Sequence, residues 1–173
     1  MQKKIIIAVV AILLIVHFLP VPSYSQGQGS GLLFHDAMVK GAKFKVDKQD
    51  GDPIQGRGAW VFRKNIEGYP CTVLSIVQQN RIQVVTLLAN RRVPKFRMAD
   101  VLLTAFTVMG ASKALDQGKN IPIDVLERQF HEVWEKIKNS LNQADRNNFY
   151  SGYYSIQIET VATENDEAVK MYF

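Results

Sequence analysis

The sequence predicts an α+β fold in which two packed helices are inserted between two groups of antiparallel strands. Segments 59–64, 71–79 and 83–91 are rich in β-branched and other apolar residues and are separated by polar turns. Segments 98–118 and 122–141 instead repeat apolar residues at helical spacing. Strand-like alternation returns at 153–164 and 167–173. This order indicates a β-meander, a helical layer and a C-terminal hairpin.

The second and third strand segments carry the most specific strand pattern. Only Asn80–Ile82 separates their ends, so the sequence predicts a tight antiparallel hairpin. Both faces of these two segments are largely apolar, as expected of central strands that helices cover on at least one side. The preceding stretch 32–46 mixes helical and strand periods and is left open, whereas 47–58 is rich in Asp and Gly and is expected to form turns.

The two helical segments are expected to differ in their surroundings. The first is apolar on nearly all sides and is therefore predicted to be deeply buried, with Gly118 as its stop. In the second, Pro122 suits the first turn, and the helix is expected to end before 143–152. The second segment has one apolar stripe for packing, which consists of Leu126, Phe130, Val133, Ile137 and Leu141.

The N-terminal residues are predicted to lie outside the domain. Two lysines are followed by a mostly apolar run at 5–19, and then Ser23 and Ser25 stand in a small, polar stretch. This arrangement is typical of a secretory signal peptide. We therefore expect a signal peptide at 1–25, a flexible spacer at 26–31 and a single domain at 32–173. An uncleaved membrane anchor is the alternative, although the apolar run is shorter than a membrane span.

The composition is that of a globular domain, with 47% hydrophobic and 21% charged residues. The net charge is +5, and it falls to +3 without Lys3 and Lys4. An excess this small does not indicate nucleic-acid binding. Cys71 is the single cysteine, so no intrachain disulfide can form, and its apolar neighbours predict a buried thiol.

A basic segment is the best candidate for ligand binding. Arg91, Arg92, Lys95 and Arg97 crowd the loop that leads into the first helix. A helix N-terminus favours anions, and arginines beside it can clamp a phosphate or a carboxylate. An anionic small molecule or a lipid head group is therefore a candidate ligand. The alternative is an ordinary charged loop that Asp100 partly neutralises.

The second helix carries the candidate for catalysis or metal binding. Glu127, His131 and Glu135 recur every four residues, and His131 with Glu132 begins a pattern close to the HExxH motif of zinc hydrolases. Glu135 replaces the second histidine of that motif, and His35 is the only other histidine after the predicted signal. One hypothesis is a metal site whose ligands are Glu127, His131 and Glu135. In that hypothesis, the catalytic residues are His131, Glu132 and Glu135. A solvated helix face with local ion pairs is the simpler one.

Two further features have alternative interpretations. The aromatic residues around Phe149–Tyr154 are expected to pack the helices against the sheet, although exposed aromatics could line a sugar or peptide groove. The last residues, 169–173, could add an edge strand to a neighbouring chain in an assembly.

The sequence contains no Gly-x-Ser-x-Gly, no Cys-x-x-Cys and no glycine-rich phosphate loop ahead of a helix. We therefore expect a non-enzymatic binding module of the cell envelope, exported to the periplasm or the cell exterior and without a cofactor. Its expected partner is an envelope protein or an anionic ligand. Membrane contact is expected only through the signal segment, if that segment stays uncleaved. A small exported metal-dependent hydrolase is the alternative.

Overall fold

The computed structural model describes residues 29–54, 56–116, 118–119, 121–143, 147–151 and 156–172. The helices are α2 (Ser30–Asp36), its π-helical continuation η1 (Ala37–Gly41), α3 (Lys95–Asp116) and α4 (Ile123–Asn142). The strands are β1 (Lys45–Gly51), β2 (Arg57–Ile66), β3 (Tyr69–Gln78), β4 (Arg81–Asn90), β5 (Asn147–Ser151), β6 (Ile156–Ala162) and β7 (Asp166–Tyr172). The expected signal peptide at 1–25 lies outside the described residues, as do Tyr153, Tyr154 and Phe173.

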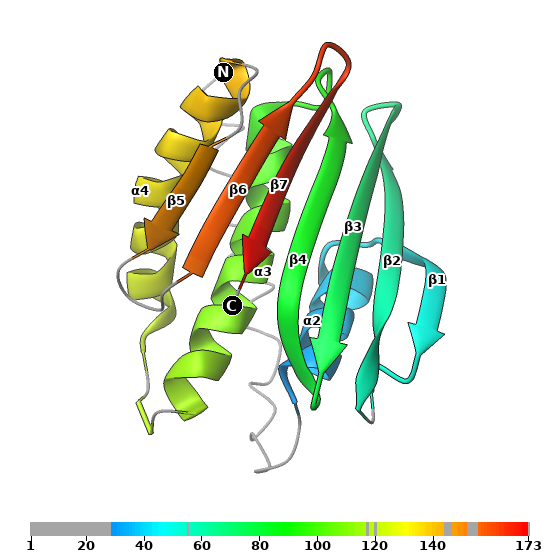
Figure 1. Cartoon of the computed structure of the whole chain (residues 1–173), viewed down its shortest axis with the longest axis vertical. Helices are drawn as coiled ribbons and strands as arrows, with labels where there is room; N and C mark the ends of the chain where they lie inside the picture. Colours follow the sequence, from blue (N-terminus) through cyan, green and yellow to red (C-terminus); the bar gives the residue numbers. More distant parts are fainter. Residues whose placement is uncertain are drawn as a thin grey trace.

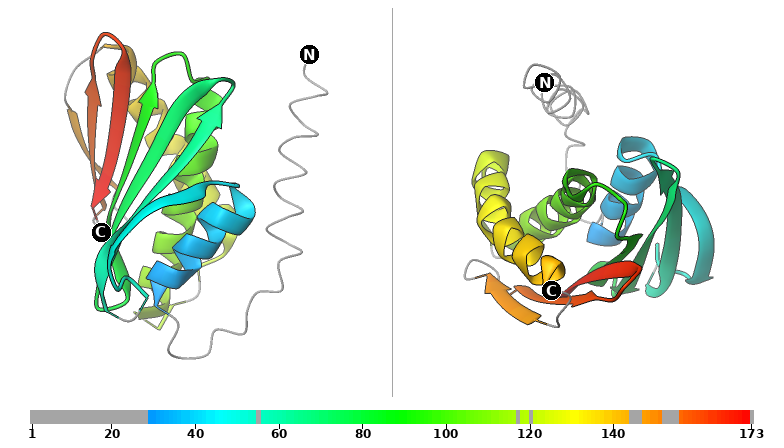
Figure 2. Two further views of the ribbon diagram at one scale, coloured as in Figure 1. Left: turned by 90° about the vertical axis from the view of Figure 1, so that its right-hand side faces the viewer. Right: turned by 90° about the horizontal axis from the view of Figure 1, so that it is seen from above.

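The strands form one seven-stranded antiparallel sheet in the order β1-β2-β3-β4-β7-β6-β5. Helices α2, α3 and α4 all lie on the same side of this sheet, so its other side faces the viewer in Figure 1. Seen from above in Figure 2, the sheet wraps around the helical layer. The predicted α+β class, with two helices between the strand groups, is confirmed.

The predicted hairpins are confirmed. Strands β3 and β4 pair from Cys71 and Ala89 down to Gln78 and Arg81. The two residues between the strands, Gln79 and Asn80, have φ angles of 51° and 61°. Two successive left-handed residues are the geometry of the tight turn that matches the twist of a hairpin. β6 and β7 form the second hairpin, which the Thr163 N–H closes by donating to the Asp166 carbonyl at 2.8 Å.

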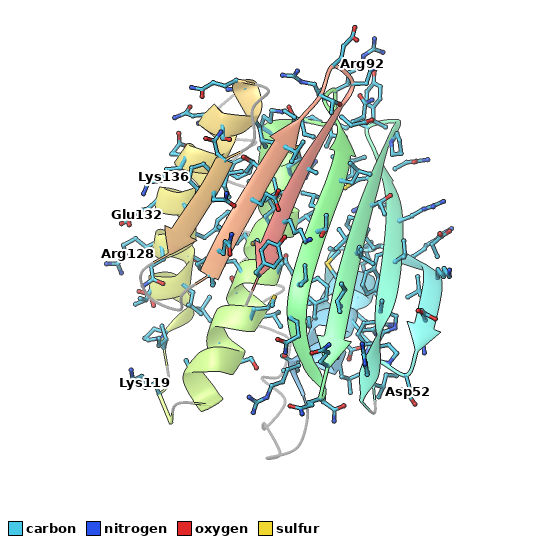
Figure 3. The ribbon with its side chains drawn as sticks, in the orientation of Figure 1. Asp52, Arg92, Lys119, Arg128, Glu132 and Lys136 are labelled. Carbon is cyan, nitrogen blue, oxygen red and sulfur yellow. The ribbon has the colours of Figure 1, made fainter. Side chains whose placement is uncertain are left out.

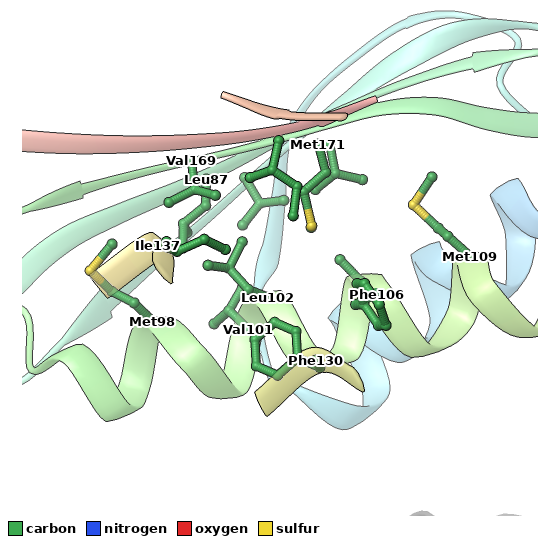
Figure 4. Packing of buried hydrophobic residues seen from close by; sticks show 14 of the residues in the cluster. Leu87, Met98, Val101, Leu102, Phe106, Met109, Phe130, Ile137, Val169 and Met171 are labelled. Atoms are coloured by element: carbon green, nitrogen blue, oxygen red, sulfur yellow. The ribbon is translucent and has the colours of Figure 1, made fainter. Parts of the chain in front are cut away.

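Helix α3 occupies the centre of the helical layer, with α2 on one side and α4 on the other (Figure 2). Its residues Met98, Leu102 and Phe106 are fully buried, which agrees with the apolar sequence of the helix. Figure 4 shows these side chains meeting apolar residues of α4, β4 and β7 in one continuous core. The five residues predicted as the stripe of α4 are all buried.

The ends of the two long helices follow the expected signals. The Lys119 N–H donates to the Ala114 carbonyl at 2.8 Å, and Gly118 has a φ of +67°, so α3 ends in the left-handed cap for which glycine is suited. Pro122 directly precedes α4. No helix in the described part of the chain is long and apolar enough to cross a membrane.

Two local expectations were wrong, and one strand was not expected. Residues 47–51, expected to form turns, belong to edge strand β1, and residues 147–151, which were assigned to no helix or strand, form edge strand β5. Ser30 and Gly31, expected in the spacer, begin α2 and are buried. The hypothesis that 169–173 add an edge strand to a neighbour is contradicted for residues 169–172, because β7 is hydrogen-bonded to β4 on one side and to β6 on the other.

The predicted burial of Cys71 is confirmed, since its side chain is 1% exposed. This burial raises the pKa of the thiol to about 12, although the charge of Lys64 opposes the shift. Among the aromatics, Trp60 is fully buried and Phe149 packs against the core, as expected of residues between helices and sheet.

Candidate functional site

The basic loop lies at the end of the sheet where β4 runs into α3, beside the turn between β6 and β7. The Arg91 N–H donates to the Asn165 carbonyl at 2.9 Å, and its guanidinium Nη1 donates to the Thr163 carbonyl at 3.0 Å. Arg92 projects from the same end of the molecule (Figure 3). These hydrogen bonds therefore join the loop to the C-terminal hairpin, which lies more than seventy residues later in the chain.

The carboxylate of Glu167, in β7, forms ion pairs with two of the four basic residues of this loop, Lys95 and Arg91. Its carboxylate is fully buried on the helix side of the sheet, opposite Ala89 and Ala162. The Lys95 ammonium donates to Glu167 Oε2, and Arg91 Nε lies 3.4 Å from Oε1. Because ion pairing to a buried carboxylate holds both cations in place, neither presents its full charge to an incoming anion.

Arg97 also has acidic neighbours. Its Nε lies 3.8 Å from Glu67 Oε1, and its Nη1 lies 3.7 Å from Asp100 Oδ2. Burial raises the pKa of Asp100, and the charges of Arg97 and Lys64 oppose that shift. The predicted neutralising role of Asp100 therefore agrees with the geometry.

Arg92 is the remaining member of the basic loop. Its side chain is exposed, and its guanidinium lies 5.8 Å from the centre of the Tyr69 ring. Within the described part of the chain, no carboxylate forms an ion pair with it. The four predicted residues do lie close together, but Arg92 alone keeps a side chain that an anion can approach without competing with a carboxylate.

The candidate metal residues lie on the solvent side of α4. His131, Glu132 and Glu135 are exposed, and Glu127 is partly buried. Lys138 Nζ pairs with Glu135 Oε2 at 2.6 Å. Figure 3 shows Glu132 pointing away from the sheet, between Arg128 and Lys136. Among the described residues, no three His, Cys, Asp or Glu side chains are placed to hold a metal ion.

The second histidine of the domain has a different environment. The His35 ring on α2 lies 5.0 Å from the Trp60 ring and 5.9 Å from the Phe62 ring, centre to centre. Its Nδ1 is 3.5 Å from Asp36 Oδ1. Contacts with aromatic rings at the edge of the core indicate a packing role for this histidine.

The uncovered side of the sheet carries an apolar surface that the sequence did not single out as a site. Residues that are directly paired across antiparallel strands point to the same face, so the strand registers define which side chains lie there. Leu88 is 47% exposed and Ile76 is 37% exposed, and their neighbours are partly exposed. We call this surface the open face. Its apolar and hydroxyl side chains are Ala59, Val61, Thr72, Leu74, Ile76, Val84, Thr86, Leu88, Val161 and Ala168. Lys170 and Tyr172 of β7 lie on the same side, paired with Thr86 and Val84.

Charged residues flank the open face on both sides. On the β1–β2 side, Lys45, Lys48 and Arg63 lie on the same side of the sheet as the open face, Asp50 is paired with Ala59, and Asp47 forms an ion pair with Arg63 at 3.2 Å. On the β6 side, Glu159 is paired with Lys170 across the strands and accepts a hydrogen bond from the Tyr172 hydroxyl at 3.1 Å. The apolar centre therefore lies between two flanks that each carry both acidic and basic side chains.

No protein-family model matches this sequence, and no curated protein and no solved structure matches it either. The functional proposal therefore depends on the geometry of the open face and of the basic loop.

Proposed function

We propose that this protein is an exported, non-enzymatic binding module of the cell envelope that docks a protein partner on the open face. The observation that supports it is the apolar character of this face. A one-sided antiparallel sheet ordinarily turns polar side chains to water, but here Leu74, Ile76, Val84 and Leu88 occupy its centre. Contiguous apolar surface of this kind typically marks a protein interaction site.

Export is supported by the charged, apolar and small-residue pattern of the first 25 residues. The described fold begins at Gly29, close behind the expected cleavage site after Ser25. Removal of the signal would therefore leave every described helix and strand intact.

The other candidate sites fit the geometry less well. An anion at the basic loop would be held chiefly by Arg92, because carboxylates already engage Arg91, Lys95 and Arg97. For the hydrolase alternative, His131 is exposed on a convex helix surface and lacks a convergent set of ligands within the described residues. Partner contact is therefore assigned to the open face.

The test is a photo-cross-link made in living cells. Leu88 is replaced by photoreactive benzoylphenylalanine in the full-length chain, and Glu132 on the outer side of α4 is replaced in a matched control. We expect irradiation to give a discrete protein adduct from position 88 and none from position 132. A mass measurement on the same material checks for loss of residues 1–25. Equal adduct formation at both positions, or none at either, would contradict the docking role.

A further inference from the structure

We infer that a polar pocket at one end of the open face binds the C-terminal carboxylate of the docked protein partner. This inference rests on the proposed docking role of the open face. It adds the part of the partner that is recognised, which is an extended segment whose last apolar residues are followed by a free carboxylate.

The pocket lies between the β1–β2 loop and the β3–β4 turn, at the end of the sheet opposite the basic loop. Figure 3 shows this separation, with Asp52 of the β1–β2 loop at one end of the molecule and Arg92 at the other. The pocket has a volume of about 540 Å³, within the usual range of ligand sites. The described residues that line it are Gly56, Arg57, Gln78, Gln79 and Gln83.

Backbone hydrogen bonds hold the walls of this pocket together. The Asn80 N–H donates to the Gly56 carbonyl at 3.2 Å, which joins the β3–β4 turn to the β1–β2 loop. Within that loop, the Gly56 N–H donates to the Asp52 carbonyl at 3.0 Å, and the Asp52 N–H donates to the Arg57 carbonyl at 3.1 Å. The site is therefore formed before a ligand arrives, which lowers the cost of binding.

Arg57 gives the pocket a positive charge. No carboxylate of the described residues forms an ion pair with its guanidinium, whereas Arg63 of the same strand is paired with Asp47. Asp52 is outside the lining, and its Oδ1 accepts the Ile54 N–H at 3.1 Å. The three glutamines add amide donors, and guanidinium and amide N–H groups together favour a carboxylate.

The glutamines also distinguish a peptide end from a simple anion. Gln83 Nε2 donates to the Arg81 carbonyl at 3.5 Å, so Gln83 Oε1 is the atom that can accept a hydrogen bond from a ligand. A peptide that ends in the pocket offers its carboxylate to Arg57 and its last backbone N–H to such an oxygen. Inorganic phosphate and fatty acids lack that N–H.

The open face continues directly from the pocket. Arg57 is paired with Gln78, and the next pair on the same side of the sheet is Ala59 with Ile76, which Val84 of β4 extends. An extended peptide rises about 3.4 Å per residue, so the residues just before its carboxylate lie over Ile76 and Val84. Apolar side chains at those positions lose contact with water, and this sets the class of sequence that fits.

The first experiment titrates the full chain, purified as the cell processes it, with the probe peptide acetyl-Leu-Val-Leu bearing a free carboxylate. Nuclear magnetic resonance follows the Arg57 Nε–H and the side-chain amides of Gln78 and Gln83. We expect saturable shifts at these groups, and roughly tenfold weaker binding or more for the same peptide with a C-terminal amide. Arg57→Gln should weaken binding of the free peptide by a similar factor. Arg63→Gln, on the same side of β2, is the matched control and should bind like the parent.

Three results overturn the inference. The first is an absence of shifts at these groups, and the second is equal affinity for the carboxylate and amide peptides. The third is unchanged affinity in Arg57→Gln, with circular dichroism as the check that each variant is folded. Dodecanoate and inorganic phosphate are titrated separately, and binding of either as tightly as the peptide overturns the assignment to a peptide end.

A second photo-cross-link separates failure of this inference from failure of the docking role. Ile76, which is 37% exposed and lies next to the pocket, is replaced by benzoylphenylalanine in the cells used for position 88. We expect the tryptic fragment linked to position 76 to be the C-terminal fragment of the partner. An internal fragment there overturns the contact with the carboxyl end, while the adduct at position 88 keeps the docking role. No adduct at either position contradicts the docking role itself.

Discussion

Glu167 is the one fully buried charged side chain in the described part of the chain. Its carboxylate joins β7 to the loop between β4 and α3 through Lys95 and Arg91. Removing one partner of a buried ion pair leaves the other charge without compensation, which typically costs about 3–5 kcal/mol. Lys95 and Arg91 are 27% and 32% exposed, so water can partly replace the carboxylate.

We therefore expect Glu167→Gln to lower the free energy of unfolding by about 2–3 kcal/mol, which is less than that range because water can reach the two cations. The amide also directs N–H donors toward cations that can only donate. Urea denaturation measures the change. Glu164→Gln, in the exposed turn just before β7, is the matched control and should stay within about 0.5 kcal/mol of the parent. Equal losses in the two variants would contradict a structural role for the buried pair.

Burial also changes the reactivity of the Cys71 thiol. A pKa raised to about 12 from a reference of 9.0 leaves far less thiolate at pH 8, and the thiolate is the species that reacts. We expect labelling of the native thiol at pH 8 to be on the order of 1,000-fold slower than in urea. A colorimetric thiol assay checks it, with a Glu132→Cys variant, whose position on α4 is exposed, as the positive control. Rapid labelling of the native parent chain would contradict the buried, protonated state.

At the scale of elements, α2 is fastened to the turn of the β3–β4 hairpin. The Gly31 N–H donates to the Asn80 carbonyl at 3.2 Å, and the Ile82 N–H donates to Ser30 Oγ at 3.0 Å. Gly29 permits this close approach, because a Cβ there would lie 2.0 Å from the Asn80 carbonyl oxygen. A backbone atom at that distance cannot be accommodated without moving the helix from the hairpin.

Gly29→Ala should therefore destabilise the domain by about 2–3 kcal/mol, the upper part of the usual range for overpacking. Gly41→Ala is the matched control, since a Cβ at that position has no atom within 4 Å. We expect the control to be neutral or slightly stabilising, because alanine restricts the unfolded chain. Thermal unfolding of the two variants tests the contact, and similar melting temperatures would show that α2 is not held as closely as described.

The same elements show why part of the fold could be predicted and part could not. The β3–β4 hairpin has two long apolar runs around a short polar break, so the local sequence pattern was enough to predict it. Strand β1 is exposed on both faces and has no alternation to detect. Strand β5 begins with Asn147 and Asn148, which are poor strand formers, and it exists because β6 offers an edge for pairing.

The candidate sites depend on contacts that no local pattern contains. Lys95 and Glu167 are 72 residues apart in sequence, so the neutralisation of the basic loop required the tertiary arrangement. The apolar character of both faces of β3 and β4 was visible in the sequence. Which face the helices cover is decided only when α2, α3 and α4 all pack on one side (Figure 2).

At the scale of the whole molecule, the uncovered apolar face affects solubility more than stability. Leu88 is 47% exposed, so Leu88→Lys removes apolar surface from contact with water without taking a side chain out of the core. We therefore expect Leu88→Lys to keep the free energy of unfolding within about 0.5 kcal/mol of the parent and to raise the concentration of ammonium sulfate needed to precipitate the folded chain. Glu132→Lys, which is exposed on the outer side of α4, is the matched control and should precipitate close to the parent. Identical precipitation of all three chains would show that the open face is not an adhesive surface, and a large loss of stability in Leu88→Lys would show that Leu88 belongs to the core.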